Sequence, residues 1–199
     1  MLKYIPSDAK RILDVGCGEG NFGCFLKEKN ASEVWGIEIV EEAGKIAKGK
    51  LDKVLIGDVN SVINDLPDNF FDCIVLNDVL EHLENPEKVL KIIAKNLTTD
   101  GFIIASIPNV RYIWNLVELV FKKDWEYKNS GILDKTHLRF FTQKSIVRMF
   151  NNAGYEVKKI EGINPTKNEK VKIFLFLTLG FFRDTRFIQF ATVAQKHRL

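Results

Sequence analysis

The sequence predicts an α/β fold built on a doubly wound, mostly parallel sheet, and three observations carry this prediction. Segments rich in Val and Ile alternate along the chain with segments whose apolar residues recur at the helical period. That alternation is typical of a parallel sheet that helices cover on both faces. The first Val- and Ile-rich segment also runs directly into a glycine-rich turn at Gly16, Gly18 and Gly20, where a strand of such a sheet would pass into its first helix.

The first two predicted strands are short apolar runs that end at glycine or charged residues. The run before the glycine turn predicts a strand at residues 11–15, and the helical period that resumes after the turn predicts a helix at 21–29. The apolar segment at 33–38 predicts the second strand. The Ala- and Lys-rich segment that follows it predicts a helix that extends to about residue 50.

Three more strands and two more helices are expected between residues 53 and 107. In chain order we expect a strand at 53–57, a short helix at 62–66, a strand at 71–76, a helix at about 86–97 and a strand at 102–107. Each strand is a mostly apolar run rich in β-branched residues. Pro86 begins the longer helix, Asp100-Gly101 is expected to form the turn into the last strand, and Pro108 stops that strand.

One helix and two strands are expected in the C-terminal part. Thr142, followed by residues 143–145, is expected to be the N-cap of a helix that ends near Asn152. Apolar residues alternate with charged residues at 155–161 and recur at 187–193, which predicts the last two strands.

The glycine turn is suited to holding a cofactor, and two cofactor classes compete for it. A turn almost free of side chains lets a ligand lie against backbone amides and the N-terminus of the next helix. A dinucleotide fingerprint, G-x-G-x-x-G, presents those amides to a pyrophosphate. Here the glycines recur at every second position, position 21 is Asn, and Asp14 stands two residues before the first glycine. A carboxylate repels a pyrophosphate and attracts an amino acid that bears a sulfonium, so the sequence favours the second ligand.

The turn resembles motif I of the class I S-adenosylmethionine-dependent methyltransferases, D-x-G-x-G-x-G, which Asp14, Gly16, Gly18 and Gly20 match. The resemblance covers about residues 11–108 and implies a Rossmann-like, seven-stranded sheet with an antiparallel C-terminal edge strand. It also implies S-adenosylmethionine as the cofactor and S-adenosylhomocysteine as the product. A glycine turn with a purely structural role is the alternative.

Strand ends and the resemblance together assign a set of cofactor-binding residues. Ligands of such sheets bind outside the carboxyl ends of the strands. Glu38, at the end of the second strand, is expected to accept hydrogen bonds from the ribose. The resemblance implies that Asp58 accepts one from the adenine amino group while Val59 packs on the ring, and the alternative for Asp58 is a helix N-cap. The full set is Asp14, Gly16, Cys17, Gly18, Gly20, Asn21, Phe22, Glu38, Ile39, Asp58, Val59, Asn77, Asp78 and Val79.

One histidine follows the fourth predicted strand. The segment at 79–83 resembles the V-L-E-H-[LV] signature of small-molecule members of the same family. That resemblance implies a catalytic place for His82, facing the donor methyl group or the substrate. The alternative is a helix-start histidine that is hydrogen-bonded to a nearby carbonyl.

A second histidine lies in the segment at 131–142, which resembles the D-x-T-H-[LI]-R-F-F element of bacterial methyltransferases of sugar and cell-surface biosynthesis. His137 is the second catalytic candidate, since an imidazole near its ordinary pKa can take a proton from an attacking hydroxyl. Asp134, Thr136 and Arg139 are close in sequence and are expected to orient its ring or hold an anionic substrate. The alternative is a loop histidine that caps a turn.

Composition limits the classes of protein that the chain can belong to. Its 199 residues, with 46% apolar and 28% charged residues, fit a single domain that spans residues 1–199. A net charge of +3 on scattered basic residues is typical of a solvated surface, so nucleic acid is not expected as a partner. The three cysteines lack the spacing of a zinc site or a disulfide framework, so we expect no metal and a cytoplasmic location. No signal peptide is expected.

The sequence thus predicts an S-adenosylmethionine-dependent methyltransferase that acts on an oxygen or nitrogen of a small molecule, such as a sugar or an intermediate of cell-envelope or natural-product biosynthesis. An enzyme that binds NAD or a nucleotide sugar, and a non-catalytic cofactor-binding partner, are the alternatives. Insertions at about 110–136, with a helical segment at 110–121, and at 164–186 are expected to form a lid or substrate cap. The apolar stretch at 171–182 is expected to pack as a lid or homodimer surface, with membrane contact as the alternative.

Overall fold

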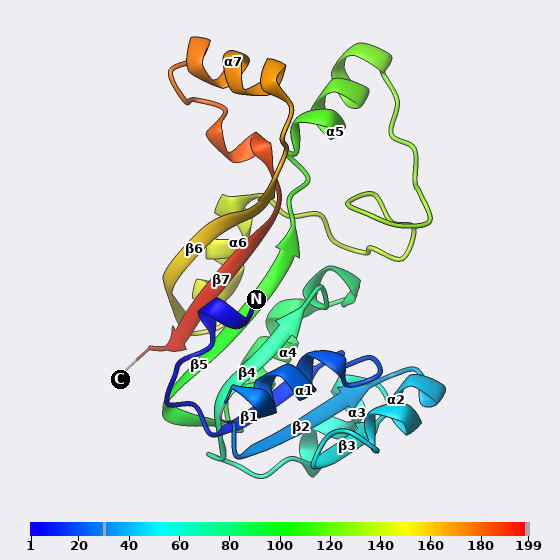
Figure 1. The fold of residues 1–199 in the computed structure, drawn as a ribbon, viewed down its shortest axis with the longest axis vertical. Coiled ribbons are helices and arrows are strands. Elements are labelled where there is room, and N and C mark those ends of the chain that lie inside the picture. The colour runs from blue at the N-terminus through cyan, green and yellow to red at the C-terminus, as the bar shows by residue number, and fades with distance from the viewer. Residues whose placement is uncertain (30, 198–199) are drawn as a thin grey trace.

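The computed structural model describes residues 1–29 and 31–197, and its strands form one sheet in the order β3-β2-β1-β4-β5-β7-β6 (Figure 1). The strands are β1 (Arg11–Val15), β2 (Glu33–Glu38), β3 (Lys53–Ile56), β4 (Phe71–Asn77), β5 (Leu97–Pro108), β6 (Tyr155–Pro165) and β7 (Phe187–Lys196). Strands β1 to β5 are parallel, and β7 is antiparallel to both of its neighbours, β5 and β6. The predicted mostly parallel sheet with an antiparallel C-terminal part is confirmed, and the antiparallel strand lies just inside the edge strand β6.

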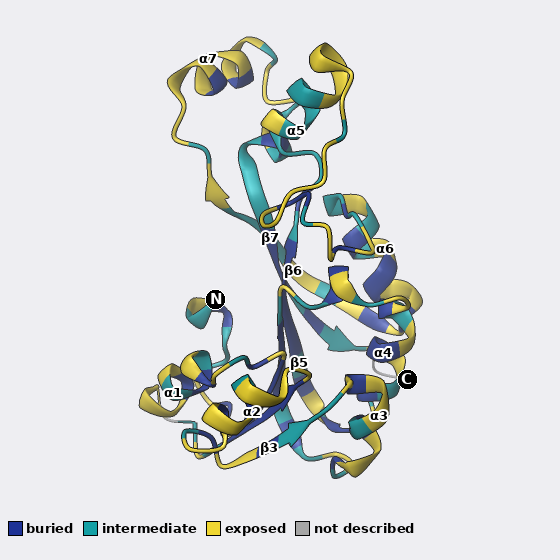
Figure 2. Cartoon of the chain, turned by 90° about the vertical axis from the view of Figure 1, so that its right-hand side faces the viewer, coloured by how far each residue is buried: buried dark blue, intermediate teal, exposed yellow. Residues whose placement is uncertain are grey.

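Helices cover both faces of the sheet (Figure 2). They are α1 (Asn21–Glu28), α2 (Glu41–Ala47), α3 (Val59–Val62), α4 (Pro86–Ile93), α5 (Ile113–Val117), α6 (Gln143–Asn152) and α7 (Glu169–Leu177). On one face, Leu26 of α1 and Ala47 of α2 join an apolar cluster with the first two strands. On the other face, Leu90 of α4 and Phe150 of α6 join a larger cluster that includes Ile74 of β4. Burial of both faces explains why the central strands read as continuous apolar runs.

Local capping sets two of the helix boundaries. The hydroxyl of Thr142 accepts a hydrogen bond from Ser145 N at 3.2 Å, and Ser145 Oγ accepts one from Thr142 N at 2.8 Å. This reciprocal pair confirms the predicted N-cap of α6. Helix α3 begins at Val59, earlier than the expected residue 62, because Asp58 Oδ1 accepts a hydrogen bond from Asn60 N at 2.7 Å and caps it there.

The turn predicted at Asp100-Gly101 is wrong, because both residues lie inside β5. The register between β4 and β5 shifts between Phe71 and Cys73, so β5 accommodates extra residues there without leaving the sheet. Gln195 Nε2 of the antiparallel strand β7 donates to Asp100 O at 3.0 Å. This pairing partner is distant in the chain, and the local turn signal gave no indication of it.

The helix expected at 110–121 is shorter than its apolar pattern suggested. Asn109 holds a turn ahead of it, because its side-chain oxygen accepts from Arg111 N at 3.0 Å and its carbonyl accepts from Tyr112 N. Helix α5 therefore begins at Ile113, continues as a π-helical turn over Glu118–Lys122, and ends where Lys123 adopts a left-handed backbone with φ of 57°.

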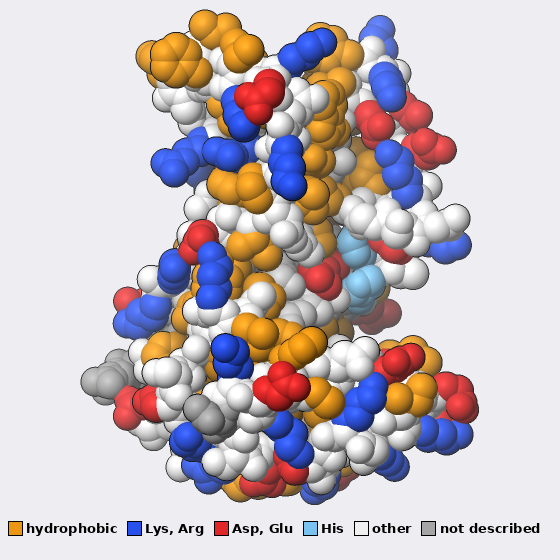
Figure 3. Space-filling model, in the orientation of Figure 1, with side chains coloured by type: hydrophobic (Ala, Val, Ile, Leu, Met, Phe, Trp, Pro, Cys, Tyr) orange, Lys and Arg blue, Asp and Glu red, His pale blue; other side chains and the backbone are white. Residues whose placement is uncertain are grey.

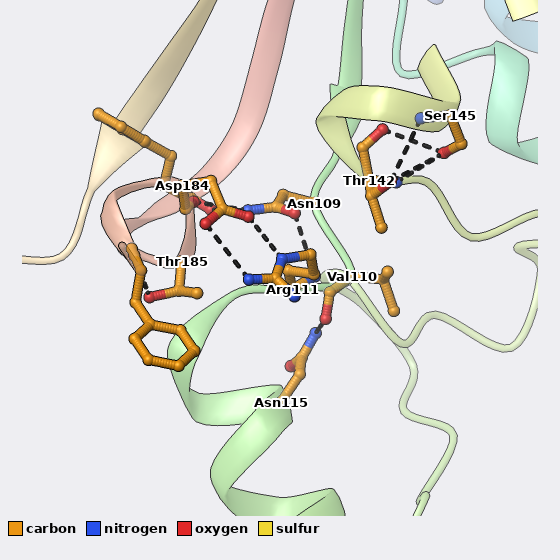
Figure 4. A network of polar contacts seen from close by, with 10 residues as sticks. Asn109, Val110, Arg111, Asn115, Thr142, Ser145, Asp184 and Thr185 are labelled. Carbon is orange, nitrogen blue, oxygen red and sulfur yellow. Dashed lines mark hydrogen bonds and ion pairs between the residues drawn. The ribbon is translucent and has the colours of Figure 1, made fainter. Parts of the chain in front are cut away.

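The two insertions are tied together where they leave the sheet. Both rise beyond the carboxyl end of β5, at the top of Figure 1. Arg111 Nε and Asp184 Oδ2 form an ion pair at 2.6 Å, and the buried Asn109 Nδ2 donates to the carbonyls of Asp184 and Phe187, both at 2.9 Å (Figure 4). The first insertion is thus anchored to the end of the second insertion.

The second insertion exposes an apolar surface that we call the α7 face. Its members are the exposed side chains Ile173, Phe174, Phe176, Leu177, Leu179 and Phe181. Val171 and Leu175, on the opposite side of α7 (Glu169–Leu177), are buried. Within residues 1–29 and 31–197, every helix falls short of the length and apolar character that crossing a bilayer requires.

Candidate active site

The glycine turn after β1 has a backbone that only glycine adopts without strain. Gly16, Gly18 and Gly20 have φ angles of 72°, 53° and 79°. A Cβ on Gly16 would lie 2.7 Å from Cγ2 of Val79, whereas a Cβ on Gly18 would meet nothing within 4 Å. Gly16 therefore packs closely against the loop after β4, and the backbone at Gly18 faces open space where a ligand can approach it.

A buried carboxylate without a partner lies beneath this turn. Asp14 is 2% exposed, and its Oδ2 atom has no hydrogen-bond donor among the described residues. Burial, together with the nearby charge of Glu38, raises the pKa of Asp14 to about 7. Asn77, at the end of the adjacent strand β4, likewise has a buried Oδ1 atom that lacks a donor in the described part of the chain. Acceptor oxygens of this kind suit a cationic ligand that carries hydrogen-bond donors.

Glu38 braces the glycine turn. Its buried carboxylate accepts a hydrogen bond from Gly18 N at 2.7 Å through Oε2 and one from Val40 N at 2.8 Å through Oε1. The side chain thereby joins the loops that follow β1 and β2. The predicted hydrogen bond from the ribose to Glu38 stays a prediction. Because both carboxylate oxygens already accept a backbone hydrogen bond, the ribose would have to donate to their remaining lone pairs.

A cavity of about 240 Å³ lies next to this turn at the carboxyl ends of β1 to β4. Seven predicted site residues line it: Gly16, Ile39, Asp58, Val59, Asp78, Val79 and His82. The alternative role of Asp58 as a helix N-cap is confirmed, because its Oδ1 atom accepts the hydrogen bond from Asn60 N at the start of α3. Its predicted bond to adenine stays a prediction. An exposed Ile39 and a buried Val59 give this cavity the apolar walls that a flat ring requires.

A second, larger cavity of about 720 Å³ adjoins the first at Asp78, which lines both. Phe22 and Asn77, both predicted cofactor residues, line it as well. Asp78 has a φ of 53°, and its Oδ1 atom accepts hydrogen bonds from Ser106 Oγ at 3.2 Å and Gln189 Nε2 at 2.6 Å. Strands β5 and β7 thus hold Asp78 at the boundary between the two cavities.

Three predicted cofactor residues turn away from both cavities. The thiol of Cys17 is buried beneath the turn, where a Cβ on Gly36 would lie 2.5 Å from it. The side chain of Asn21 accepts a hydrogen bond from Lys50 Nζ at 2.8 Å on the outer surface. Gly20 lies close to α2, where its absent side chain makes room for Ala47. A ligand could meet these residues only through their backbone.

The two candidate histidines lie together although they come from distant segments. His82 ends the short η3 turn (Leu80–His82), and its ring lies 4.7 Å from the ring of His137 in an edge-to-face arrangement. The backbone carbonyl of Glu81 accepts hydrogen bonds from Leu138 N at 2.8 Å and Arg139 N at 3.0 Å, which docks the two segments against each other. Histidine side chains are visible beside acidic side chains in the hollow between the sheet and the insertion loop (Figure 3).

The two histidines differ in exposure and in partners. His82 lines the smaller cavity, and its Nδ1 atom lies 3.2 Å from both the carbonyl oxygen and Oγ1 of Thr136. His137 is buried behind it, and its Nδ1 atom donates to Ile132 O at 2.9 Å. Thr136 therefore orients His82, whereas it was expected to orient His137.

Asp134 and Arg139 also have partners other than the expected ones. Asp134 Oδ1 accepts from Thr136 N at 2.8 Å and Thr136 Oγ1 at 2.7 Å, so it supports His82 through Thr136. Arg139 Nη2 donates to Glu84 O at 2.6 Å. Both side chains thus stabilise the docking of the 131–142 segment on the loop after β4.

Glu81 is the site residue that sequence analysis missed. It is 1% exposed, neither of its carboxylate oxygens has a hydrogen-bond partner in the described residues, and Oε1 lies 4.0 Å from Nε2 of His137. Burial raises the pKa of Glu81 to about 8. The acid directly precedes His82 in the V-L-E-H-L segment, but nothing local indicated that it would be buried against a second histidine.

Known proteins resemble this chain over most of its length. The model of the family described as a methyltransferase domain matches residues 1–160. A ubiquinone biosynthesis O-methyltransferase of Rickettsia conorii is 27% identical over 85% of this chain, which spans 61% of that protein's length. One of Neisseria meningitidis is 27% identical over 81% of this chain and 72% of its own length. A methyltransferase structure from Archaeoglobus fulgidus has a TM-score of 0.74 at 22% identity over 98% of this chain and 89% of its own.

These matches agree with the site geometry. The family match includes β1 to β5, the glycine turn and the loop after β4, which line both cavities. The structural match covers nearly the whole chain and shows that the antiparallel C-terminal strands belong to the same fold. A glycine turn that is open at Gly18, above an acid whose Oδ2 atom lacks a partner in the described residues, fits S-adenosylmethionine. The chain therefore belongs to the methyltransferase domain family of S-adenosylmethionine-dependent methyltransferases.

Proposed function

We propose that this protein transfers a methyl group from S-adenosylmethionine to an oxygen or nitrogen of a small molecule. The observation that carries the proposal is the buried Asp14 side chain, whose Oδ2 atom has no hydrogen-bond partner among the described residues and lies beneath a backbone that is open at Gly18. Relatives named for O-methylation support an oxygen acceptor. A sugar or an intermediate of cell-envelope or natural-product biosynthesis is the acceptor class that we propose.

The two ends of the cofactor have separate sets of residues. Asp14 and Asn77 offer buried acceptor oxygens to the ammonium of its amino-acid end. Glu38 reaches the ribose from the turn that it braces, and Asp58 with Val59 borders the apolar cavity that would take adenine. When bound, S-adenosylmethionine supplies an electrophilic methyl group on a sulfonium sulfur.

The histidines stand on the acceptor side of the proposed site. Methyl transfer is an in-line displacement, so the protein must align the acceptor and exclude water. It must also remove the proton of the acceptor group or lower the pKa of that group. His82 lines the cavity and is the ring that an acceptor can reach. His137 lies behind it and fixes its place by ring contact. We assign acceptor activation to this pair.

We expect S-adenosylmethionine to bind in calorimetry and NAD to show no heat of binding, because the Asp14 carboxylate attracts a sulfonium and repels a diphosphate. The transfer itself is tested by incubating the protein with isotopically labelled S-adenosylmethionine and fractionated cell extract, followed by mass spectrometry of labelled products. Binding of NAD in preference would contradict the proposal. Binding of S-adenosylmethionine without a labelled product from any fraction would favour the non-catalytic alternative.

We propose that the insertions form a lid or cap. The apolar stretch at 171–182, which carries the α7 face, then packs on the domain as part of this lid or forms a homodimer surface. The ion pair between Arg111 and Asp184, which joins the insertions at their base, supports their acting as one unit. We also propose a cytoplasmic location, which the free thiols of Cys17, Cys24 and Cys73 support, since unpaired cysteines are typical of reducing compartments.

The α7 face is expected not to bind lipid, so the wild-type protein should stay in the supernatant when anionic vesicles are pelleted. The variant carrying Phe176→Glu and Phe181→Glu should behave in the same way in this assay. As a matched control, Phe25→Glu alters an exposed phenylalanine of α1 (Asn21–Glu28), far from the insertions in Figure 1. Pelleting of the wild type and of the control, but not of the double variant, would establish membrane contact instead.

A further inference from the structure

We propose that Glu81, His82 and His137 bind a divalent transition-metal cation, such as Zn²⁺, on the acceptor side of the site. Only the catalytic role of the ion rests on the proposed function. Binding of the ion can be measured without cofactor or acceptor. The sequence offered no metal-ligand spacing, because the three residues come from two distant segments.

Glu81 supplies the first observation. Its carboxylate is almost fully buried, and in the described part of the chain no lysine, arginine or hydrogen-bond donor contacts either oxygen. An uncompensated buried carboxylate is strongly destabilising. Nε2 of His137 lies 4.0 Å from Glu81 Oε1, which is too far for a hydrogen bond. A positive charge between the two groups would satisfy both of them.

The orientation of His137 supplies the second observation. Its Nδ1 atom lies 2.9 Å from Ile132 O, and since a carbonyl oxygen only accepts, Nδ1 must carry the proton. In the neutral ring, Nε2 then presents a lone pair toward Glu81. Metal-binding histidines typically donate their other ring N–H group to a backbone carbonyl or carboxylate in this way.

His82 has the same arrangement through Thr136. The hydroxyl of Thr136 donates to Asp134 Oδ1 at 2.7 Å, so Thr136 Oγ1 and Thr136 O are both acceptors toward His82. Nδ1 of His82 must therefore be the donor, and its Nε2 atom is left with the lone pair. Asp134 is hydrogen-bonded to Thr136 and so helps to orient this ring indirectly, as residues that hydrogen-bond the partners of metal ligands do.

The three ligand groups converge on one point. One ligand atom from each of Glu81, His82 and His137 lies within 4.8 Å of the others. Ligands held about 2.0–2.2 Å from a common Zn²⁺ ion lie roughly 3.3–3.6 Å apart in a tetrahedral site, so small side-chain movements close the set. Two imidazoles and a carboxylate favour zinc and neighbouring transition metals over Mg²⁺, which prefers oxygen ligands.

Three protein ligands leave one position open, as in catalytic zinc sites. His82 lines the smaller cavity, so the open position is accessible from it. A cation there would lower the pKa of an acceptor hydroxyl. The hydroxyl proton passes to solvent, the new O–CH₃ bond forms as the C–S bond of S-adenosylmethionine breaks, and S-adenosylhomocysteine leaves with the sulfur electron pair.

The test is metal binding by the whole chain, without a polyhistidine tag and after chelator treatment and dialysis. Co²⁺ and Zn²⁺ are titrated separately, with visible absorption of Co²⁺ and elemental analysis as readouts. We expect one ion per wild-type chain. Glu81→Gln, His82→Gln and His137→Gln should each weaken binding by about tenfold or more. His197→Gln, which alters the exposed third histidine, should bind like the wild type.

Several outcomes would overturn the proposal. Absence of stoichiometric binding by the wild type would mean that Glu81 is neutral and simply protonated against His137. Equal affinity of wild type and His82→Gln, whose ring is exposed and can be altered without emptying the core, would place the ion elsewhere. A Co²⁺–thiolate absorption band would place it on a cysteine. Binding of S-adenosylmethionine, measured on the metal-free protein, tests the proposed function separately from the metal site.

Discussion

Replacing Asp14 by Asn is expected to weaken binding of S-adenosylmethionine by about tenfold or more and to stabilise the ligand-free protein at pH 8. The loss of affinity follows because a hydrogen bond to a charged group contributes roughly 1.5–3 kcal/mol. The gain in stability follows because the wild-type carboxylate is buried and its Oδ2 atom has no donor among the described residues, whereas Asn carries no charge there.

The pH dependence of this effect has a definite sign. The pKa of Asp14 is about 7 in the folded protein and near 3.8 in the unfolded chain. Between these values the folded state holds a proton that the unfolded state has lost, so Asp14 lowers the free energy of unfolding as pH rises through this window. The full cost, on the order of a few kcal/mol, is present above pH 7 and absent below about pH 4.

Calorimetric binding and thermal unfolding between pH 5 and pH 8.5 check both parts of the prediction. Wild-type affinity should increase as pH rises through 7, whereas the affinity of Asp14→Asn should stay flat. The difference in melting temperature between variant and wild type should grow over the same range. Asp65→Asn, at an exposed position, is the matched control and should change neither quantity. A variant with wild-type affinity at pH 8 would remove Asp14 from the cofactor site.

Replacing Glu38 by Ala is expected to lower the affinity for S-adenosylmethionine by more than about tenfold, since charge-assisted hydrogen bonds are lost. Two effects combine in this variant. Gly18 N and Val40 N lose the carboxylate that they now share, which loosens the turn. The ribose loses its proposed acceptor. Amide hydrogen exchange at Gly18 and Val40 should accelerate in the variant and so report the first effect alone.

A double-mutant cycle separates the proposed ribose contact of Glu38 from its hydrogen bonds to Gly18 N and Val40 N. The wild type should bind S-adenosylhomocysteine more tightly than an analogue that lacks a ribose hydroxyl, whereas Glu38→Ala should bind both equally. Glu42→Ala, which removes an exposed acid of α2 (Glu41–Ala47), is the control. If the variant discriminates between the two ligands as strongly as the wild type does, Glu38 is a brace and not a ribose ligand.

The succession of strands and helices along the chain could be predicted because it depends on short-range patterns. Each central strand is buried on both faces, so its apolar run is visible in the sequence. The N-cap of α6 could be predicted for the same reason, since Thr142 and Ser145 are three residues apart. The Asp100-Gly101 turn failed because a register shift between β4 and β5 keeps both residues inside β5 (Leu97–Pro108). There Asp100 O accepts a hydrogen bond from the side chain of Gln195, almost a hundred residues away in β7 (Phe187–Lys196).

The sequence by itself determined the cofactor turn and the class of ligand that it favours. Asp14 and the three glycines are neighbours in the chain, and glycine adopts the positive φ angles of this turn without strain. Only the tertiary structure decided how Glu38 is used and that Glu81 faces His137. These contacts depend on where separate loops dock, and docking is set by packing and hydrogen bonds between distant segments, which no local pattern records.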